Sequence, residues 1–491
     1  MTSYESFYSG GQFPTDPNYG SLFTGYRSMF SDLGTSMDAR TANQIKETSK
    51  HLNTGLKVFE VAAHSPEVFD AFPKDHLKEI NRLQKLTGTE ATMHAPMIDP
   101  TGITQHGFDK MLRETAENQL WNAIERSHDL NPEGNVVVTM HASTVGLPAP
   151  EEKIRIGENI KPEVRSRLLI DPQGALHQIR EKAESTFFPR EGMKEENIGK
   201  PIKFDAEYEA EKMNKDIWQN QLTNLAFSTF RGKDEVERAM DMVPGADKLT
   251  KQDWDALQSN KEIPQVEQLL SLGSSFLKDS YLNLQKMFDM AYKNSEGKDK
   301  EALNNYAKEL IPHVEDFNKA RPDDLKKFAN MIEKGHDILT NMQPKILTPL
   351  REFAVEKSAE TVSNIALQSY KKFKDSSPII SLENHPAYQS LLTTGEDLKD
   401  VIEKARKDFV EKAVRDGISK SEAKSASEKI IGATWDVGHI NMLRKYGFND
   451  EDIIEQTKKV APFVKHVHLS DNFGYEHTEL PMGMGNVPLK E

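Results

Sequence analysis

Short apolar runs that end in polar side chains recur near both ends of the chain. The run 464–469 alternates apolar and polar residues and carries His468 at its end. Similar runs further up the chain end in His94, His141 and Glu383. Each has the length and the β-branched composition of a strand. Strands that all carry functional groups at their C-terminal ends are typical of a parallel β/α barrel, so the pattern predicts an α/β fold of that kind.

The first part of the chain alternates between predicted strands and amphipathic helices. Helices are indicated by apolar residues about three or four apart, by Pro73 in the first turn of one helix, and by Asp38 or Thr41 as the cap of another. The alternation indicates a parallel sheet with right-handed crossovers. The predicted strands of this part cover 31–37, 56–61, 90–94 and 136–141.

The middle of the chain, 147–376, shows little strand alternation and is predicted to be mainly helical. Only 153–169 and 201–204 give weak strand signals. Apolar residues form helical stripes, which are more typical of core packing than of a cofactor site. Several long helices in one segment indicate a bundle inserted between the fourth and fifth strands of the barrel. The stripes lie within 266–287, 303–314 and 325–338.

Alternation of strands and helices returns after residue 376. Strands are predicted over 379–383, 432–436 and 464–469, which with the four upstream strands makes seven. The barrel is therefore expected to lack its eighth strand in this chain. An open edge of this kind would pair with a strand from a partner chain or from a missing C-terminal segment. The predicted parts are an irregular arm (1–30), a first half of the barrel (31–146), the helical insertion (147–376) and a second half of the barrel (377–491).

Composition narrows the class of protein and the kind of metal site. Of the 491 residues, 37% are hydrophobic and 29% are charged, as in soluble globular proteins. The sequence contains no run of about 18 apolar residues, so no transmembrane helix is predicted. Cysteine is absent, which excludes disulfides and thiolate zinc sites and agrees with a cytoplasmic location. The net charge of −14 weighs against non-specific binding to nucleic-acid phosphates.

Histidines and carboxylates at the predicted strand ends form a candidate metal site. Asp436 and His439 follow one strand as an Asp-x-x-His pair, and Glu383 and His468 would project from neighbouring strands toward the same mouth. Nitrogen and oxygen ligands without sulfur suit Zn²⁺ or Mn²⁺. Two or three such ions could clamp a phosphodiester and activate a water, whereas one ion could hold a sugar and polarise its carbonyl.

Other polar residues nearby are expected to have supporting or structural roles. Asp471 follows the last strand and is predicted to support His468 or to brace the loop that follows. We expect a structural role for three further histidines, which do not form a comparable pattern with other ligand-type residues in the sequence: His64, His385 and His466.

Six short motifs lie at or just after the predicted strand ends. They are Met93-His94-Ala95-Pro96, Thr139-Met140-His141, Leu382-Glu383-Asn384, Trp435-Asp436-Val437-Gly438-His439, Val467-His468-Leu469-Ser470-Asp471 and Pro481-Met482-Gly483-Met484-Gly485-Asn486. Together they resemble the endonuclease IV and xylose-isomerase-like TIM-barrel superfamily (AP endonuclease family 2). The resemblance covers roughly 31–144 and 377–491, and the insertion has no counterpart in it.

The resemblance implies a set of zinc ligands. Endonuclease IV holds three zinc ions with nine ligands. In the loop after the seventh strand, His477 and Glu479 stand where that family has an Asp-x-His pair, so the third ion is the one affected by the difference. The ninth ligand is a glutamate on the eighth strand. Six further ligand positions fall on His94, His141, Glu383, Asp436, His439 and His468.

The leading hypothesis is a metal-dependent hydrolase that resembles endonuclease IV and acts in DNA repair. It would cleave phosphodiester bonds at abasic sites in DNA, with Glu383 and His439 taking part in catalysis as well as in metal binding. Retention of both His94 and His141 favours this arrangement over the smaller metal set of sugar isomerases. The first alternative is a sugar or sugar-phosphate isomerase or epimerase with one divalent ion. The second is a non-catalytic or split barrel that acts as a binding scaffold.

Overall fold

The computed structural model describes most of the chain, apart from its N-terminal segment and several short internal stretches. The predicted irregular arm, 1–30, lies outside the described part, as do the first two residues of the strand predicted over 31–37. Two compact units are formed, one by the residues up to 206 together with 348–491, the other by 207–347. The described residues are 33–146, 151–155, 163–181, 187, 194–259, 264–317 and 321–491.

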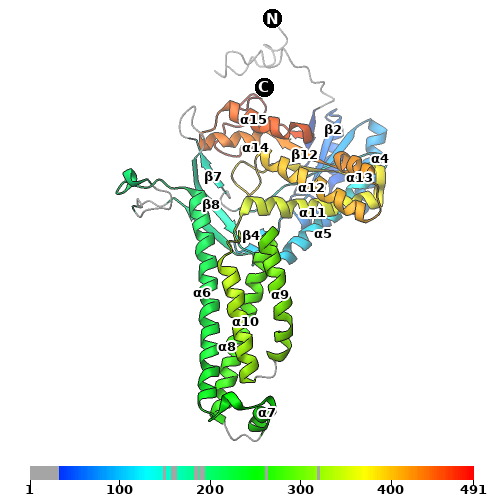
Figure 1. The fold of residues 1–491 in the computed structure, drawn as a ribbon. Helices are drawn as coiled ribbons and strands as arrows, with labels where there is room; N and C mark the ends of the chain where they lie inside the picture. The colour runs from blue at the N-terminus through cyan, green and yellow to red at the C-terminus, as the bar shows by residue number, and fades with distance from the viewer. Residues whose placement is uncertain are drawn as a thin grey trace. The chain divides into compact units, whose positions relative to one another are not determined.

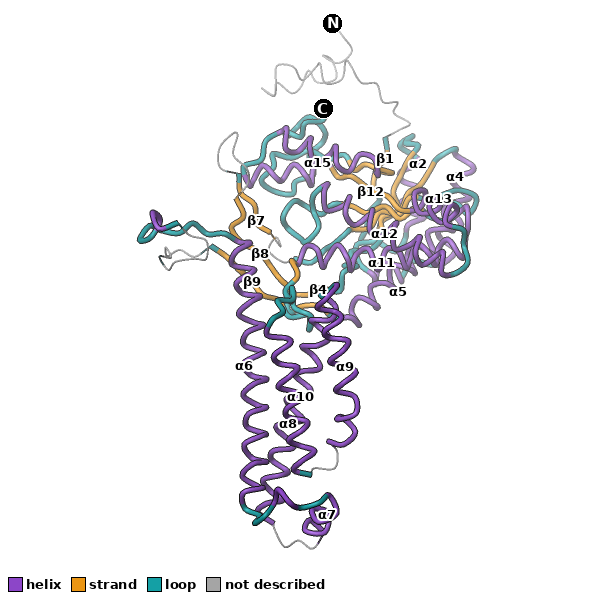
Figure 2. Tube along the Cα trace, viewed as in Figure 1, coloured by secondary structure: helices purple, strands orange, loops and turns teal. Residues whose placement is uncertain are grey.

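The first unit is built around a parallel sheet of seven strands, which confirms the predicted α/β class and the seven predicted strands (Figure 2). The strands are β1 (Gly34–Ser36), β2 (Val58–Ala62), β3 (Glu90–His94), β6 (Val137–His141), β11 (Ile379–Glu383), β12 (Ile431–Asp436) and β13 (Val464–His468). Their order in the sheet follows the chain. The parallel pairing places His141 opposite Glu383 and Asp436 opposite His468. The ends of β3 and β6, and those of β11 and β12, are offset by two residues, which keeps the side chains on the same face. The predicted ligands at the strand ends therefore lie along one edge.

The sheet is curled into a half-barrel. Four strands separate β2 from β13 in the sheet order, yet Oε1 of Glu60 in β2 lies 3.3 Å from Nε2 of His468 in β13. Within the described part of the chain, β1 and β13 form no ladder with each other. The strands thus form an open, curved sheet whose inner face is lined by polar side chains near the strand ends.

Helices of the first unit connect the strands and pack on the sheet (Figure 1). Two of them begin with capping boxes, formed by Thr394 with Asp397 and by Asn449 with Asp452. The helix Leu350–Phe373 falls in the segment 147–376 but packs against helices of this unit. The helices are α2 (Gln44–Leu52), α3 (Pro66–Asp70), α4 (Lys74–Thr87), α5 (Lys110–Ser127), α11 (Leu350–Phe373), α12 (Gly395–Arg415), α13 (Lys420–Ile430), α14 (Val437–Asn441) and α15 (Asp450–Val460).

A smaller antiparallel sheet also belongs to the first unit. It coincides with the weak strand signal over 153–169, whereas 201–204 carries only an isolated bridge residue. Its long strand β8 pairs with β7, β9 and β10. The separate pair β4 (Ile103–Thr104) and β5 (Gly107–Phe108) forms a short hairpin. The strands of the sheet are β7 (Glu151–Ile154), β8 (Glu163–Ile170), β9 (Leu176–Arg180) and β10 (Thr348–Pro349).

The second unit consists of helices packed on one apolar core, as the stripes predicted. Val266, Leu270, Leu284 and Phe328 are among its buried residues. A Cβ at Gly273 would lie 2.9 Å from the carbonyl oxygen of Gly232, so glycine permits the close crossing of the two longest helices. No helix among the described residues is both long enough and apolar enough to cross a membrane. The helices are α6 (Ala206–Asp241), α7 (Lys251–Ser259), α8 (Pro264–Asn294), α9 (Gly297–Phe317) and α10 (Pro322–Thr340).

Candidate metal centre

Glu383 is the residue at which the candidate ligands meet. It ends β11, is 1% exposed, and faces imidazole rings from three other strands. Its Oε2 lies 3.1 Å from Nε2 of His94 and 3.4 Å from Nε2 of His141. Its Oε1 lies 2.6 Å from Nδ1 of His468. The parallel register therefore gathers the ends of β3, β6, β11 and β13 into one cluster.

Asp436 and His439 extend this cluster on the side of β12. Asp436 caps α14, where its Oδ1 accepts a hydrogen bond from the backbone N–H of His439 at 2.8 Å. The Nδ1–H of His439 donates to the carbonyl oxygen of Asn384 at 2.6 Å. This bond fixes the tautomer and leaves Nε2 facing the Asp436 carboxylate, 3.7 Å away. Metal-binding histidines are commonly oriented in this way through the nitrogen that does not bind the ion.

Two groups of three ligand-type residues share Glu383. One group is His94, His141 and Glu383, and the other is Glu383, Asp436 and His439. Within each group, one ligand atom per residue can be chosen so that all lie within 4.8 Å of one another. The structure thus brings together five of the predicted ligands, with His468 joined to them through Glu383: His94, His141, Glu383, Asp436 and His439.

The two carboxyl groups have opposite pKa shifts. Burial alone would raise the pKa of Glu383, but the rings of His141, His468 and His94 hold it well below the ordinary value. The pKa of Asp436 is raised, because burial and the charge of Glu383 outweigh the attraction of His439. Glu383 is therefore the fixed negative charge of the cluster, and Asp436 accepts a proton more readily than an ordinary aspartate.

The three histidines around Glu383 differ in charge. Burial would lower the pKa of His94 and of His468, but contact with Glu383 and the charge of Glu60 raise these values to about 9 and about 11. His141 is dominated by burial, which lowers its pKa to about 3. A divalent ion must displace the protons of the two charged rings, so metal affinity should rise with pH.

The loop after β13 brings His477 to the edge of the cluster. Its Nε2 lies 2.9 Å from Nε2 of His439, close enough for one ring to donate to the other or for both to bind one ion. Burial and the neighbouring His439 lower the pKa of His477. Glu479 lies on the solvent side, with Oε1 4.0 Å from Nε2 of His477 and a side chain that is 76% exposed. Of the two predicted loop ligands, His477 is the one held against the cluster.

Asp471 braces the C-terminal loop. Its carboxylate accepts backbone hydrogen bonds from Gly483, Gly485 and Val487 at 2.8–3.0 Å. A Cβ at Gly485 would lie 2.4 Å from Oδ1 of Asp471, so this turn requires glycine. Among the described residues no hydrogen bond joins this carboxylate to His468. Of the two predicted roles, Asp471 therefore braces the loop and does not support His468.

Two further residues face the same side of the sheet and were not predicted to act there. Glu60 received no role, and His466 was expected to be structural. In the structure both lie beside His468, with Nε2 of His466 3.6 Å from Oε2 of Glu60. The signal that could have found Glu60 is its position in β2, where one carboxylate interrupts the apolar residues Val58–Ala62.

Comparisons with known proteins give similarity over a limited part of the chain. No family model matches, and no solved structure matches. Over 113 residues the chain is 28% identical to "Uncharacterized protein MJ1311" of Methanocaldococcus jannaschii. The match covers 23% of this chain and 30% of that protein, so it spans less than a third of the length of the relative. The name of this relative states no activity, and the geometry of the strand ends is the basis for interpreting the site.

Proposed function

We propose that the chain is a divalent-metal-dependent hydrolase that resembles endonuclease IV and cleaves phosphodiester bonds, with DNA containing an abasic site as its substrate. The half-barrel would then be part of a TIM barrel of the same superfamily. The observation that carries the proposal is the pair of three-ligand groups joined by Glu383. Two ions held close together are typical of enzymes that cleave phosphate esters, because they stabilise both the attacking and the leaving oxygen.

The side chains at the strand ends fit divalent transition ions. Imidazole and carboxylate donors without sulfur suit Zn²⁺ or Mn²⁺. Bonds of about 2.0–2.1 Å in a tetrahedral zinc site separate neighbouring ligand atoms by about 3.3–3.4 Å. The Nε2 atoms of His94 and His141 lie 3.1 and 3.4 Å from the same oxygen of Glu383. These separations are therefore compatible with an ion bound by all three residues.

In the proposed mechanism the protein supplies the placement of the ions and of the groups that bind them. Bound ions would polarise the phosphoryl oxygens of the substrate and bring the pKa of a bound water close to neutrality. Glu383 stays ionised between the two groups, and the bond from Asn384 keeps Nε2 of His439 directed toward the cluster. Asp436 would bind the ion of its group as a carboxylate, and the backbone N–H of His439 holds its Oδ1 in place.

A sugar or sugar-phosphate isomerase or epimerase is the second candidate. The observation that favours it is the net charge of −14, which opposes the approach of DNA. An enzyme of this kind would use one ion rather than two or three. The number of ions bound by the two groups that share Glu383 therefore separates the two candidates.

Incision of a labelled DNA duplex with one abasic site tests the leading proposal. We expect the Zn²⁺- or Mn²⁺-loaded chain to cut the duplex, and His141→Gln to be at least about 100-fold slower, because it removes a metal ligand. The matched control is His128→Gln, whose ring bonds to Ser376 before the start of β11 and should not affect the rate. Equal rates for the unaltered chain and His141→Gln would contradict the proposal.

A further inference from the structure

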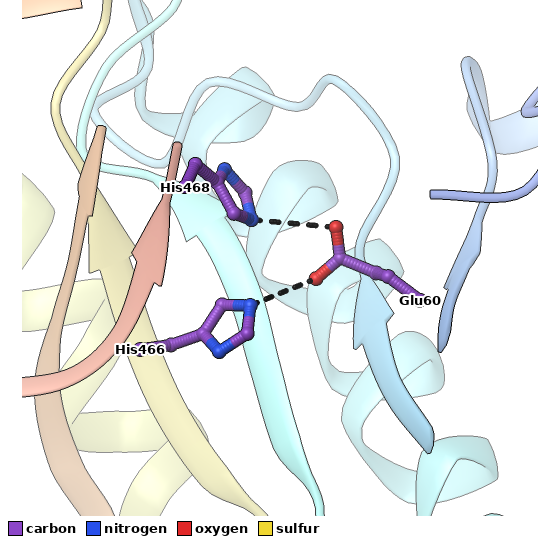
Figure 3. A group of neighbouring side chains, drawn as sticks. All are labelled: Glu60, His466 and His468. Atoms are coloured by element: carbon purple, nitrogen blue, oxygen red, sulfur yellow. Dashed lines mark ion pairs between the residues drawn. The ribbon is translucent and has the colours of Figure 1, made fainter. Parts of the chain in front are cut away.

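A second cluster of ligand-type side chains lies between β2 and β13 (Figure 3). Glu60 is the central residue of β2. His466 and His468 are two residues apart in β13, so both rings lie on the same face of that strand. The carboxylate of Glu60 points toward both rings from across the inside of the curled sheet (Figure 3).

Each oxygen of Glu60 faces one of the rings. Oε1 lies 3.3 Å from Nε2 of His468, and Oε2 lies 3.6 Å from Nε2 of His466. Hydrogen-bonded nitrogen and oxygen atoms lie about 2.7–3.2 Å apart, whereas two ligands of a tetrahedral zinc ion lie about 3.3–3.4 Å apart. The observed separations are thus compatible with an ion bound between the three residues.

The cluster also contains a buried nitrogen that the chain does not satisfy. Nε2 of His468 has no hydrogen-bond partner among the described residues, and its contact with Oε1 of Glu60 at 3.3 Å is an ion pair. Glu60 is only 5% exposed, and the hydroxyl of Thr92 donates to its Oε2 at 3.1 Å. A buried polar atom without a partner is costly, so a ligand that binds it would be strongly favoured.

The two nitrogens of His468 face different carboxylates. Nδ1 lies 2.6 Å from Oε1 of Glu383, while Nε2 faces Glu60. An ion bound by Glu60 would therefore lie on the other side of the His468 ring from Glu383. Neither Glu60 nor His466 belongs to the two groups that share Glu383, so this cluster can be altered separately from the candidate metal centre.

We propose that Glu60, His466 and His468 form an additional cation site that takes a divalent transition ion such as Zn²⁺. Two imidazoles and one carboxylate are a known ligand set for zinc, with a position left for water. The ion would join β2 to β13, which lie near opposite edges of the sheet, and would hold the sheet in its curled form. The site does not depend on the proposed hydrolase activity.

The number of Co²⁺ ions bound by the full chain tests this site. It can be measured by equilibrium dialysis with metal analysis and by the visible absorption of protein-bound cobalt. Glu60→Gln and His466→Gln should each bind about one ion per chain fewer than the unaltered protein. His141→Gln should lose a different ion, so that the double variant of His141 and His466 loses both. The control His128→Gln should keep the full number.

Metal-catalysed oxidation of the unaltered chain provides a test that needs no variant. An Fe²⁺ ion bound at the site, in the presence of ascorbate and hydrogen peroxide, should oxidise the His466 ring. Peptide mass spectrometry should find this product well above the level at His128, and excess Zn²⁺ should suppress it.

Two results would overturn the proposed site. One is an unchanged number of Co²⁺ ions in both Glu60→Gln and His466→Gln. This holds also if Glu60→Gln weakens the binding of all ions without changing their number, because Glu60 would then merely orient His468. The other is oxidation of His466 at no more than the level of His128.

Discussion

The half-barrel unit and the helical unit bury different kinds of side chain. The helical unit buries continuous apolar stripes, and its buried ionisable residues are few, with Glu235 and Asp324 as examples. The half-barrel buries carboxylates and imidazoles together at the inner face of its sheet. Charges are costly to bury unless they are paired or bind a metal, so this contrast places the chemistry at the strand ends. The buried ionisable residues of that face are Glu60, His141, Glu383, Asp436 and His439.

Of the changes that test this contrast, Glu383→Gln should have the largest effect on stability and on metal binding. The substitution removes the charge that both ligand groups share and leaves His94 and His468 without their partner. Breaking buried ion pairs of this kind costs about 3–5 kcal/mol, and the ions of both groups should be lost. Urea unfolding of the metal-free protein and metal analysis measure the two effects.

The matched control for that substitution is Glu333→Gln in the helical unit. Glu333 pairs with Lys233 at 3.0 Å and is 45% exposed, so its loss should cost less than about 1 kcal/mol. A full complement of ions in Glu383→Gln would show that Glu383 is not the shared ligand.

A cavity in the helical unit should lower the stability of that unit without changing the number of bound metal ions. Phe328 is 0% exposed, and Phe328→Ala should destabilise the helical unit by about 3–5 kcal/mol. Hydrogen exchange should report the loss in α8 and α10, while the number of ions per chain stays the same. A variant that loses ions along with helical stability would contradict the separation of the two roles.

Removal of metal should destabilise the half-barrel unit and leave the helical unit unchanged. An ion present at about 100–1,000 times its Kd stabilises the state that binds it by about 3–4 kcal/mol. A chelator should therefore speed hydrogen exchange in β3, β11 and β13 and leave the exchange of α8 unchanged. Equal protection of the strands with and without chelator would argue against metal binding at this edge.

The pH dependence of the metal-free chain should show the smallest of these effects. The pKa of His141 is lowered from the ordinary value of 6.5 to about 3, so between these values the unfolded chain binds a proton that the folded chain does not. Stability should fall as the pH drops below 6.5. In His141→Gln the difference in bound protons between the unfolded and the folded chain should be smaller by up to about one. The free energy of unfolding should therefore fall by about 2 kcal/mol less between pH 6.5 and 4.5 than in the unaltered chain.

Urea unfolding in the presence of a chelator at several pH values measures that difference. His128→Gln serves as the control, because the pKa of His128 is lowered less, by burial. The account of His141 would be wrong if its variant and the unaltered chain lost stability in parallel.

Much of the half-barrel could be predicted because its strands carry a repeated signal. Each predicted strand has a short apolar run, and parallel pairing of neighbouring strands brings their C-terminal ends to one edge. For this reason the meeting of His94, Glu383 and Asp436 followed from sequence positions nearly 350 residues apart. The stripes of the helical unit were readable for a similar reason, since a spacing of about 3.6 residues marks the buried face of a helix.

The parts that could not be predicted depend on contacts between distant segments. Glu60 gains its surroundings only when the sheet curls and brings β2 opposite His466 in β13. Asp471 braces the C-terminal loop because a turn at Gly485 returns the chain to it, and sequence spacing does not fix that turn. The strand β9 shows no clear alternation, because it forms part of a small sheet on β8.

The most direct test of the account is an anomalous diffraction map, recorded at the zinc edge, of crystals grown from the zinc-loaded chain. We predict a peak about 2.0–2.2 Å from ligand atoms of His94, His141 and Glu383, and a second peak shared by Glu383, Asp436 and His439. A map with no peak at this edge of the sheet, or with zinc only at exposed surface carboxylates, would contradict the claim that these strand ends form a metal centre.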